Sequence, residues 1–199
     1  MSYQADDSAR LQDLLGAFHA GAMGREETHS LVLDLIRERI GCDRVSMWRF
    51  DGVDPTLLRF AAKVAGAPLE TGELRLDAAD YGAFFKVLLE SGTYVSRQVG
   101  ADPVLDPLRA RYLGPDGVAA LLVAAFLVNN RAYGMICCEA TTARDWAASE
   151  VFALRAICNR IALLMWTAPE SVLQTTPWLP VRTPPTAPAP ASPPWSRRR

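Results

Sequence analysis

The amino-acid sequence predicts an α+β fold in which helices cover a central antiparallel sheet, and residues 117–166 indicate this most clearly. Residues 118–128 are an apolar run without alternation, so both faces of this strand are expected to be covered, as in a central strand. Asn129-Asn130 follows, and asparagine tolerates the positive φ angles of a type I′ hairpin turn. A second strand and a helix over 147–166 complete the segment. The apolar side of this helix carries Val151, Leu154, Ile157, Ile161 and Leu164.

Two helices are predicted in the first 41 residues. Residues 8–20 place apolar side chains on one helical face, and Gly21 and Gly24 then interrupt the pattern. Residues 25–40 form the second helix, and Gly41 is its expected C-cap. The apolar positions of the two helices are Leu11, Leu14, Leu15 and Phe18, and then Leu31, Val32, Leu35, Ile36 and Ile40.

Two strands follow, at 43–51 and 57–65, with a turn at Asp54-Pro55 between them. Alternation in the first strand puts Val45, Met47 and Arg49 on one face and Ser46, Trp48 and Phe50 on the other. The middle of the chain predicts a helix over 78–91, a short strand over 93–99 and a short helix over 104–113.

Composition excludes several classes of protein. Half of the 199 residues are hydrophobic, which allows one sizeable domain. The net charge is −1, and residues 1–166 alone carry −4, which argues against nucleic-acid binding. The N-terminus lacks the features of a signal peptide, and the longest charge-free apolar run has 11 residues where a membrane span needs roughly 20. The sequence therefore predicts a cytoplasmic protein without membrane contact.

The segment 167–199 differs in composition from the rest. It holds nine of the 14 prolines and ends in Arg-Arg-Arg. Such a segment cannot form a core, and we expect a disordered tail. The stretch 182–188, RTPPTAP, matches a basic PxxP docking pattern.

The four cysteines are expected to be buried, reduced thiols. Cys42, Cys137, Cys138 and Cys158 form no C-x-x-C pair, and the chain has only two histidines. Cys137 and Cys138 are neighbours within a strand, so their side chains should point to opposite faces. The sequence thus predicts no metal ligands, no cofactor and no catalytic residues.

Four local motifs carry a resemblance to a known family. They are CDRVSMW at 42–48, YGAFF at 81–85, ADP at 101–103 with YLGPDGV at 112–118, and GMICCE at 134–139 with RDW at 144–146 and Glu150. Together with the order of elements, they resemble the sensory GAF domains of bacterial histidine kinases and diguanylate cyclases. The resemblance implies a GAF domain over residues 8–166. Its central antiparallel sheet would have about five to six strands with helices on both faces, and its N- and C-terminal helices would pack on one side.

The resemblance also implies a ligand site. GAF domains usually hold ligands between the sheet and the helices that cover it, which here are residues 78–91 and 104–113. An aromatic wall with a few polar groups suits a small organic ligand. The alternative is that the aromatic side chains fill the core. The candidate ligand-binding residues are Trp48, Phe50, Tyr81, Phe84, Phe85 and Tyr112, with Asp102 and Arg109 as polar anchors.

The function implied by the resemblance is that of a stand-alone sensor in bacterial signal transduction rather than an enzyme. It would bind a small ligand or a protein partner and signal through helix rearrangement. The expected partners are an unidentified small molecule, a histidine kinase or diguanylate cyclase, and a second copy paired through helices 8–20 and 147–166. Two alternatives remain open. One is a ligand-free adaptor that recruits partners through its Pro-rich tail, and the other is a thiol redox enzyme or sensor similar to free methionine sulfoxide reductase.

Overall fold

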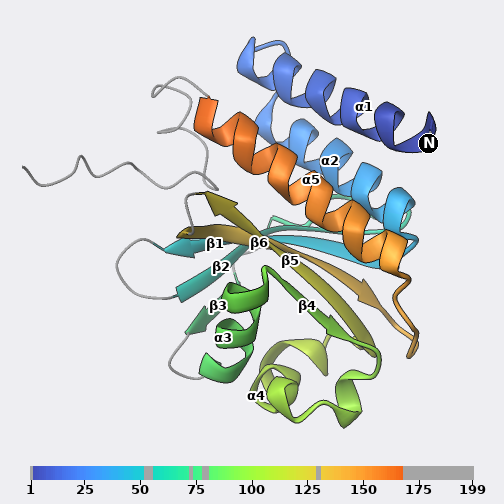
Figure 1. The fold of residues 1–199 in the computed structure, drawn as a ribbon, viewed down its shortest axis with the longest axis vertical. Helices are drawn as coiled ribbons and strands as arrows, with labels where there is room; N and C mark the ends of the chain where they lie inside the picture. The colour runs from blue at the N-terminus through green and yellow to red at the C-terminus, as the bar shows by residue number, and fades with distance from the viewer. Residues whose placement is uncertain (1, 52–55, 72–73, 78–80, 129–130, 168–199) are drawn as a thin grey trace, which may run out of the picture.

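The structure, a computed structural model, describes residues 2–51, 56–71, 74–77, 81–128 and 131–167. The predicted turns at Asp54-Pro55 and Asn129-Asn130 and the predicted tail beyond Thr167 lie outside these residues. The described part of the chain forms a sheet between two layers of helices and loops (Figure 1).

Six strands form one sheet in the order β3-β2-β1-β6-β5-β4, and each neighbouring pair is antiparallel. This confirms the predicted antiparallel sheet of five to six strands. The strand β3 was not predicted as an element, because its alternating sequence, Leu-Arg-Leu-Asp, is only four residues long. The strands are β1 Arg44–Asp51, β2 Thr56–Val64, β3 Leu74–Asp77, β4 Thr93–Ser96, β5 Ala120–Val128 and β6 Arg131–Ala140.

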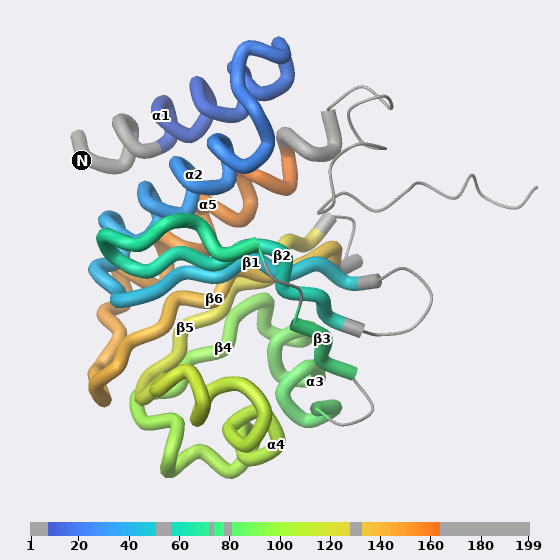
Figure 2. The backbone as a smooth tube through the Cα atoms, turned by 180° about the vertical axis from the view of Figure 1, so that it is seen from behind, coloured from blue at the N-terminus to red at the C-terminus, as the bar shows by residue number. Residues whose placement is uncertain are grey.

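The helices cover both faces of the sheet, as predicted. The helices α1 (Ser2–His19), α2 (Arg25–Ile40) and α5 (Ala148–Thr167) form a layer on one face, so the N- and C-terminal helices share one side. The helix α3 (Gly82–Ser91) and the loop that contains α4 (Asp106–Leu108) lie on the other face, as the view from behind also shows (Figure 2). At the end of α2, Gly41 has a φ of 65° and its N–H donates to the Arg37 carbonyl at 2.8 Å, which confirms the predicted C-cap.

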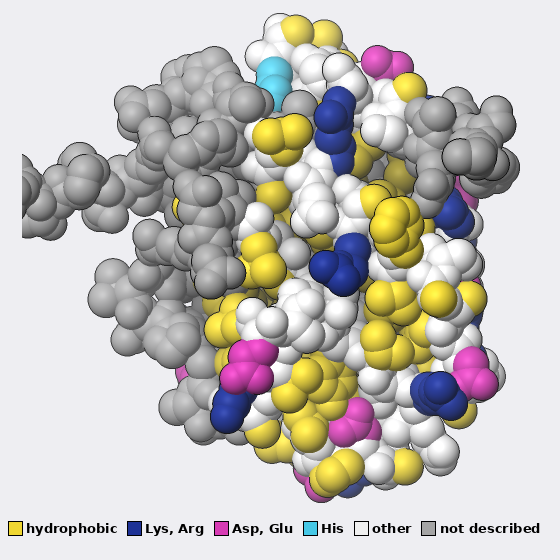
Figure 3. Space-filling view, viewed as in Figure 1, with side chains coloured by type: hydrophobic (Ala, Val, Ile, Leu, Met, Phe, Trp, Pro, Cys, Tyr) yellow, Lys and Arg dark blue, Asp and Glu magenta, His cyan; other side chains and the backbone are white. Residues whose placement is uncertain are grey.

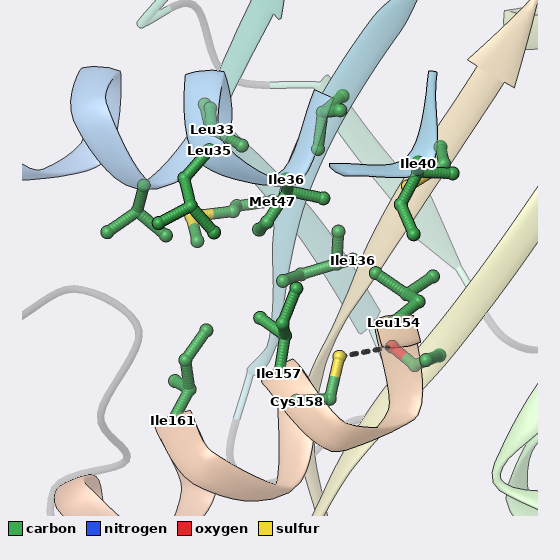
Figure 4. Close-up of a cluster of buried hydrophobic side chains, with 14 of the residues drawn as sticks. Leu33, Leu35, Ile36, Ile40, Met47, Ile136, Leu154, Ile157, Cys158 and Ile161 are labelled. Atoms are coloured by element: carbon green, nitrogen blue, oxygen red, sulfur yellow. Dashed lines mark hydrogen bonds between the residues drawn. The ribbon is translucent and has the colours of Figure 1, made fainter. Parts of the chain in front are cut away.

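The helix-side core lies between the sheet and α1, α2 and α5. Burial of its aliphatic side chains from β1, β5, β6 and these helices stabilises the helix layer (Figure 4). The thiol of Cys158 points at the Ala124 carbonyl oxygen of β5, 3.6 Å away. Members of this core that are at most 1% exposed include Leu33, Ile36, Ile40, Met47, Ile136, Leu154, Cys158 and Ile161.

The strand β5 contributes to a core on each face, which explains its unbroken apolar sequence. Leu122, Ala124 and Phe126 belong to the helix-side core. Leu121, Val123 and Ala125 belong to a second core, which we call the loop-side core, under α3 and the loop 99–113. The prediction that both faces of this strand are covered is confirmed.

The prediction of one continuous helix over 104–113 is wrong. The segment is divided into the 3₁₀ turn η2 (Pro103–Leu105), the short α4 and the π turn η3 (Arg109–Leu113). Pro107 has no N–H to continue a helix from the preceding turn, and Gly114 N–H bonds back to the Arg109 carbonyl at 2.8 Å, which widens the last turn. The predicted strand over 93–99 is also shorter, because β4 ends at Ser96.

Within the described part of the chain, none of the helices combines the length and the apolar character that are needed to cross a membrane.

Candidate ligand site

The loop-side core is rich in aromatic side chains from four segments of the chain. Strand β1 contributes Trp48, α3 and the residue before it contribute three rings, β4 contributes Tyr94, and η3 contributes Tyr112. Its buried members include Trp48, Leu57, Leu76, Tyr81, Phe84, Phe85, Leu88, Tyr94, Leu105, Leu108, Tyr112, Met135 and Cys137.

The six predicted aromatic residues lie in this one core. Trp48 and Tyr112 meet edge to face, with ring centroids 5.1 Å apart. Phe85 is 5.5 Å from Phe84, 6.2 Å from Phe50 and 6.5 Å from Tyr81, measured between centroids. Phe50 is partly buried, and the other five are at most 5% exposed. The structure therefore groups these rings, and such dense contact is also what the core-filling alternative expects.

The two predicted polar anchors have structural partners in the loop. Asp102 accepts a hydrogen bond from the Tyr94 hydroxyl at 2.9 Å and another from Val104 N–H at 3.2 Å. Arg109 donates to the Gly100 carbonyl at 2.8 Å and pairs with Asp106, also at 2.8 Å. Asp102 thus touches the aromatic core through Tyr94, whereas these two bonds hold the Arg109 guanidinium to its own loop.

A buried polar cluster stands within the loop-side core, and the sequence did not predict it as a site. The carboxylate of Glu139 on β6 accepts hydrogen bonds from the Ser46 hydroxyl at 2.8 Å and from the Tyr112 hydroxyl. The indole N–H of Trp48 donates to the Ser46 oxygen at 2.9 Å. Glu139 is 1% exposed, and Ser46 and Trp48 are fully buried. Two hydroxyls, one from β1 and one from η3, therefore meet at the Glu139 carboxylate, and Trp48 supports the Ser46 hydroxyl.

Ion pairs connect this cluster to the protein surface. Arg44 Nε lies 3.3 Å from Glu139 Oε2, and Arg44 Nη1 lies 2.7 Å from Asp116 Oδ2. Arg59 approaches the same Asp116 oxygen at 3.4 Å. Both guanidinium groups lie within 6 Å of the Tyr112 ring centroid, at 5.8 and 5.9 Å. The charge of Glu139 is thus balanced by Arg44, and Arg44 is balanced in turn by a partly exposed aspartate.

Burial sets the protonation of the cluster. It raises the pKa of Glu139, and the charge of Arg44 offsets part of this effect. Burial and the nearby Glu139 carboxylate also raise the pKa of Tyr112, so its hydroxyl keeps its proton and remains a donor. The hydroxyls of Ser46 and Tyr112 and the indole N–H of Trp48 therefore all donate within the cluster, inside an apolar surrounding.

The strand pattern contained a signal for this cluster. Ser46 and Trp48 were correctly assigned to one face of β1, and Arg44 shares that face by the same alternation. Glu139 is an acidic residue inside an otherwise apolar strand, and it lies directly opposite Arg44 in the register. A carboxylate in such a position is rarely buried unless it is paired, so the sequence could have indicated a partner for it.

The cysteines are placed as predicted. All four are buried, and Cys138 faces the helix-side core while Cys137 faces the loop-side core. Burial raises the pKa of Cys137, Cys138 and Cys158, which disfavours the reactive thiolate. Among the described residues, no group of three or more histidine, cysteine, aspartate or glutamate side chains could hold a metal ion.

Solved structures with a similar fold include those of a bacteriophytochrome and a cyanobacteriochrome. The chromophore-binding domain of the unusual bacteriophytochrome RpBphP3 from R. palustris is 16% identical, with a TM-score of 0.62 over 86% of this chain and 64% of that one. The longer structure of the same bacteriophytochrome gives 0.64 at 16% identity, over 88% of this chain. The GAF domain of the cyanobacteriochrome TePixJ gives 0.57 at 16% identity, over 72% of this chain and 89% of that one.

The chain spans 64% of the RpBphP3 domain and 39% of the longer bacteriophytochrome structure. At this identity, the likeness shows the fold alone. No curated protein matches the chain. A sequence model of the GAF domain matches residues 24–165, which is most of the described chain and contains every strand of the sheet. The chain therefore belongs to the GAF domain family.

Proposed function

We propose that this protein is a sensory GAF module that binds a small, flat organic molecule in the loop-side core. The observation that carries the proposal is the buried cluster of Glu139, Ser46, Tyr112 and Trp48 inside an aromatic surrounding. Small-molecule sites are mostly apolar and contain a few convergent polar groups that fix the ligand. Two structures of similar fold are a chromophore-binding domain of a bacteriophytochrome and a GAF domain of a cyanobacteriochrome, which supports the same class of function.

A ligand in this position would be able to influence the helix layer. The strands β5 and β6 carry side chains of both cores, and α5 packs directly on β5. A ligand shifts the arrangement of the helices only if it binds one arrangement more tightly than another. We therefore infer that the signal passes through the sheet from the loop-side core to α5.

The outer surface of α5 supports the proposal of a homodimer. Five exposed positions follow the 3-4-3-4 spacing of a helix seam, and Phe152 and Leu163 are 61% and 52% exposed. The five are Ser149, Phe152, Ala156, Asn159 and Leu163. We propose that this seam pairs with the seam of a second copy. The output partner would be a histidine kinase or diguanylate cyclase in the cytoplasm, and a pull-down with the full chain that recovers neither would contradict that assignment.

The seam predicts a change of oligomeric state. Phe152→Asp places a charge at the most exposed apolar side chain of α5, and we expect it to convert a dimer into a monomer because an interface centre tolerates an unpaired charge poorly. Light scattering after size exclusion measures the mass of each variant. Leu89→Asp is the matched control, since Leu89 is 45% exposed on α3, on the opposite side of the sheet. A wild-type chain that is monomeric at micromolar concentration would contradict the proposal.

The two alternative functions have less support. The adaptor alternative depends on a tail outside the described residues. The thiol alternative needs an accessible thiolate, whereas the four cysteines are at most 6% exposed. If replacing all four cysteines with serine abolished a measured reductase activity, that result would favour the thiol alternative.

The ligand proposal is tested by native mass spectrometry of the purified chain, followed by denaturation to release bound molecules. We expect a retained small molecule in the wild type and strongly reduced occupancy in Ser46→Ala and Glu139→Gln, because both changes weaken the same hydrogen-bonded group. The matched control is Leu89→Ala on the exposed side of α3, which should retain the molecule. The adaptor alternative would be favoured if the purified wild-type protein carried no small molecule and if no metabolite extract raised its thermal stability.

A further inference from the structure

A groove of about 250 Å³ opens in the helix layer, on the face of the sheet opposite to the loop-side core. Its walls come from α1, α2 and α5, so a molecule in the groove would touch three helices at once. Hydrophobic side chains surround a few basic ones on this side of the molecule (Figure 3). The residues that line the groove include Leu11 of α1, Arg39 of α2, and Phe152, Ala156, Ile157 and Arg160 of α5.

The groove has an apolar floor and a positive charge. Leu11 is 1% exposed and Ile157 is 7% exposed, so the floor is continuous with the helix-side core. Two arginines line the groove, and none of its lining residues in the part of the chain that the structure describes is acidic. Phe152 stands at the edge with 61% of its surface exposed and can cover an apolar ligand. Phe152 and Ala156 also belong to the proposed dimer seam, so a ligand in the groove and a second copy on the seam would compete for them.

The donor groups of Arg160 define the polar end. Its Nη2 donates to the side-chain oxygen of Gln12 on α1, which orients the guanidinium across the groove. Its Nε is enclosed and has no hydrogen-bond partner among the described residues. This enclosed Nε is turned away from solvent, so a ligand would have to bond to the Nη groups, and an anionic acceptor there would also neutralise the local charge.

We propose that this groove binds a small organic anion with an apolar body, such as an aromatic carboxylate. The apolar body would lie on Leu11 and Ile157 beneath Phe152, and the carboxylate would reach Arg160, with Arg39 nearby. The volume lies below the roughly 300–1,000 Å³ of sites for drug-sized ligands, so the occupant is a compact molecule. Because it would join α1 to α5, it would bias the helix arrangement independently of the loop-side core.

The test uses the full chain and two probes of equal shape, naphthoate and the neutral naphthamide, with ligand-observed NMR titration. We expect naphthoate to bind at least about tenfold more tightly than naphthamide, because only the carboxylate carries a charge opposite to that of the guanidinium. Arg160→Gln should remove most of this difference. Ala156→Trp should abolish binding of both probes by filling the groove, and Arg155→Gln, an exposed change on α5 outside the groove, should alter neither.

Two further measurements separate this site from the other proposals. Glu139→Gln changes the loop-side core and should leave naphthoate binding unchanged. Each of the two proposed sites can therefore be disproved without disproving the other. Equal affinity for the two probes, or naphthoate binding that survives Ala156→Trp, would overturn the proposal. The proposal is also overturned if naphthoate does not bind the wild-type protein and light scattering gives a lower mass for Ala156→Trp than for the wild type. That result would mean that a second copy of the chain occupies the groove. Thermal melting confirms that each variant is folded.

Discussion

Replacing Gly134 with alanine is expected to destabilise the protein by about 3 kcal/mol or more, enough to unfold many domains. Gly134 lies on β6 between β1 and β5, opposite Arg49 and Phe126. A Cβ atom there would stand 2.2 Å from the Trp48 carbonyl oxygen and 3.2 Å from the Phe126 ring. The first contact is with main chain in the middle of the sheet, so β1 and β6 would have to separate to relieve it.

Urea unfolding of Gly134→Ala, followed by fluorescence, measures this cost. The matched control is Gly82→Ala, at the first residue of α3, where a Cβ would have no neighbour within 4 Å. We expect the control to be neutral or stabilising by up to about 1 kcal/mol, because alanine favours a helix more than glycine does. Similar midpoints for the two variants would show that the close approach of β1 and β6 is not essential. A large loss is also expected to disturb Trp48 and the polar cluster.

The sequence predicted much of the sheet, because alternation and apolar runs are local signals. The faces of β1 and the opposite orientation of Cys137 and Cys138 followed directly from the two-residue period. The strand β3 was missed because its alternation extends over only four residues, which is the shortest run that indicates a strand. Element type was therefore most predictable where the chain is long and periodic.

The centre of the candidate site was not predicted, because it depends on contacts between distant segments. Tyr112 donates to Glu139 from a π turn that follows Pro107, where periodicity had suggested a regular helix. The alternation of β1 places Arg44 on the face of Ser46 and Trp48, but it does not show which residue of another strand lies opposite Arg44. Arg109 was chosen as the anchor, whereas Arg44, quoted in the first motif, is the residue that pairs with the buried carboxylate.

Arg44→Leu is expected to destabilise the protein by about 3–5 kcal/mol, because it leaves the Glu139 carboxylate buried without its cation. Glu139→Leu should cost less, about 1–3 kcal/mol. In that variant Arg44 keeps Asp116 at 2.7 Å, and the hydroxyls of Ser46 and Tyr112, which are 3.3 Å apart, are able to bond to each other. The double variant should be more stable than Arg44→Leu alone, since it contains no unpaired buried charge. Urea unfolding of the four proteins gives the coupling free energy directly.

The pH dependence of unfolding shows why Arg44→Leu lowers the stability of the protein. Burial already raises the pKa of Glu139 in the folded state, and removal of Arg44 should raise it further. When the pKa of a carboxyl group is higher in the folded protein than in the unfolded chain, the folded protein is most stable below the pKa of the unfolded chain, where the group is protonated in both states. The protein loses this stability as the pH rises through the pKa of the folded state. The cost of Arg44→Leu should therefore shrink as the pH is lowered, because a protonated Glu139 needs no cation. Arg59→Leu is the control, since Arg59 pairs with partly exposed acids at 3.4 and 3.9 Å and should cost under about 1 kcal/mol. A cost for Arg44→Leu that equals the control, or that does not change with pH, would mean that Glu139 is not held as an ionised group inside the core.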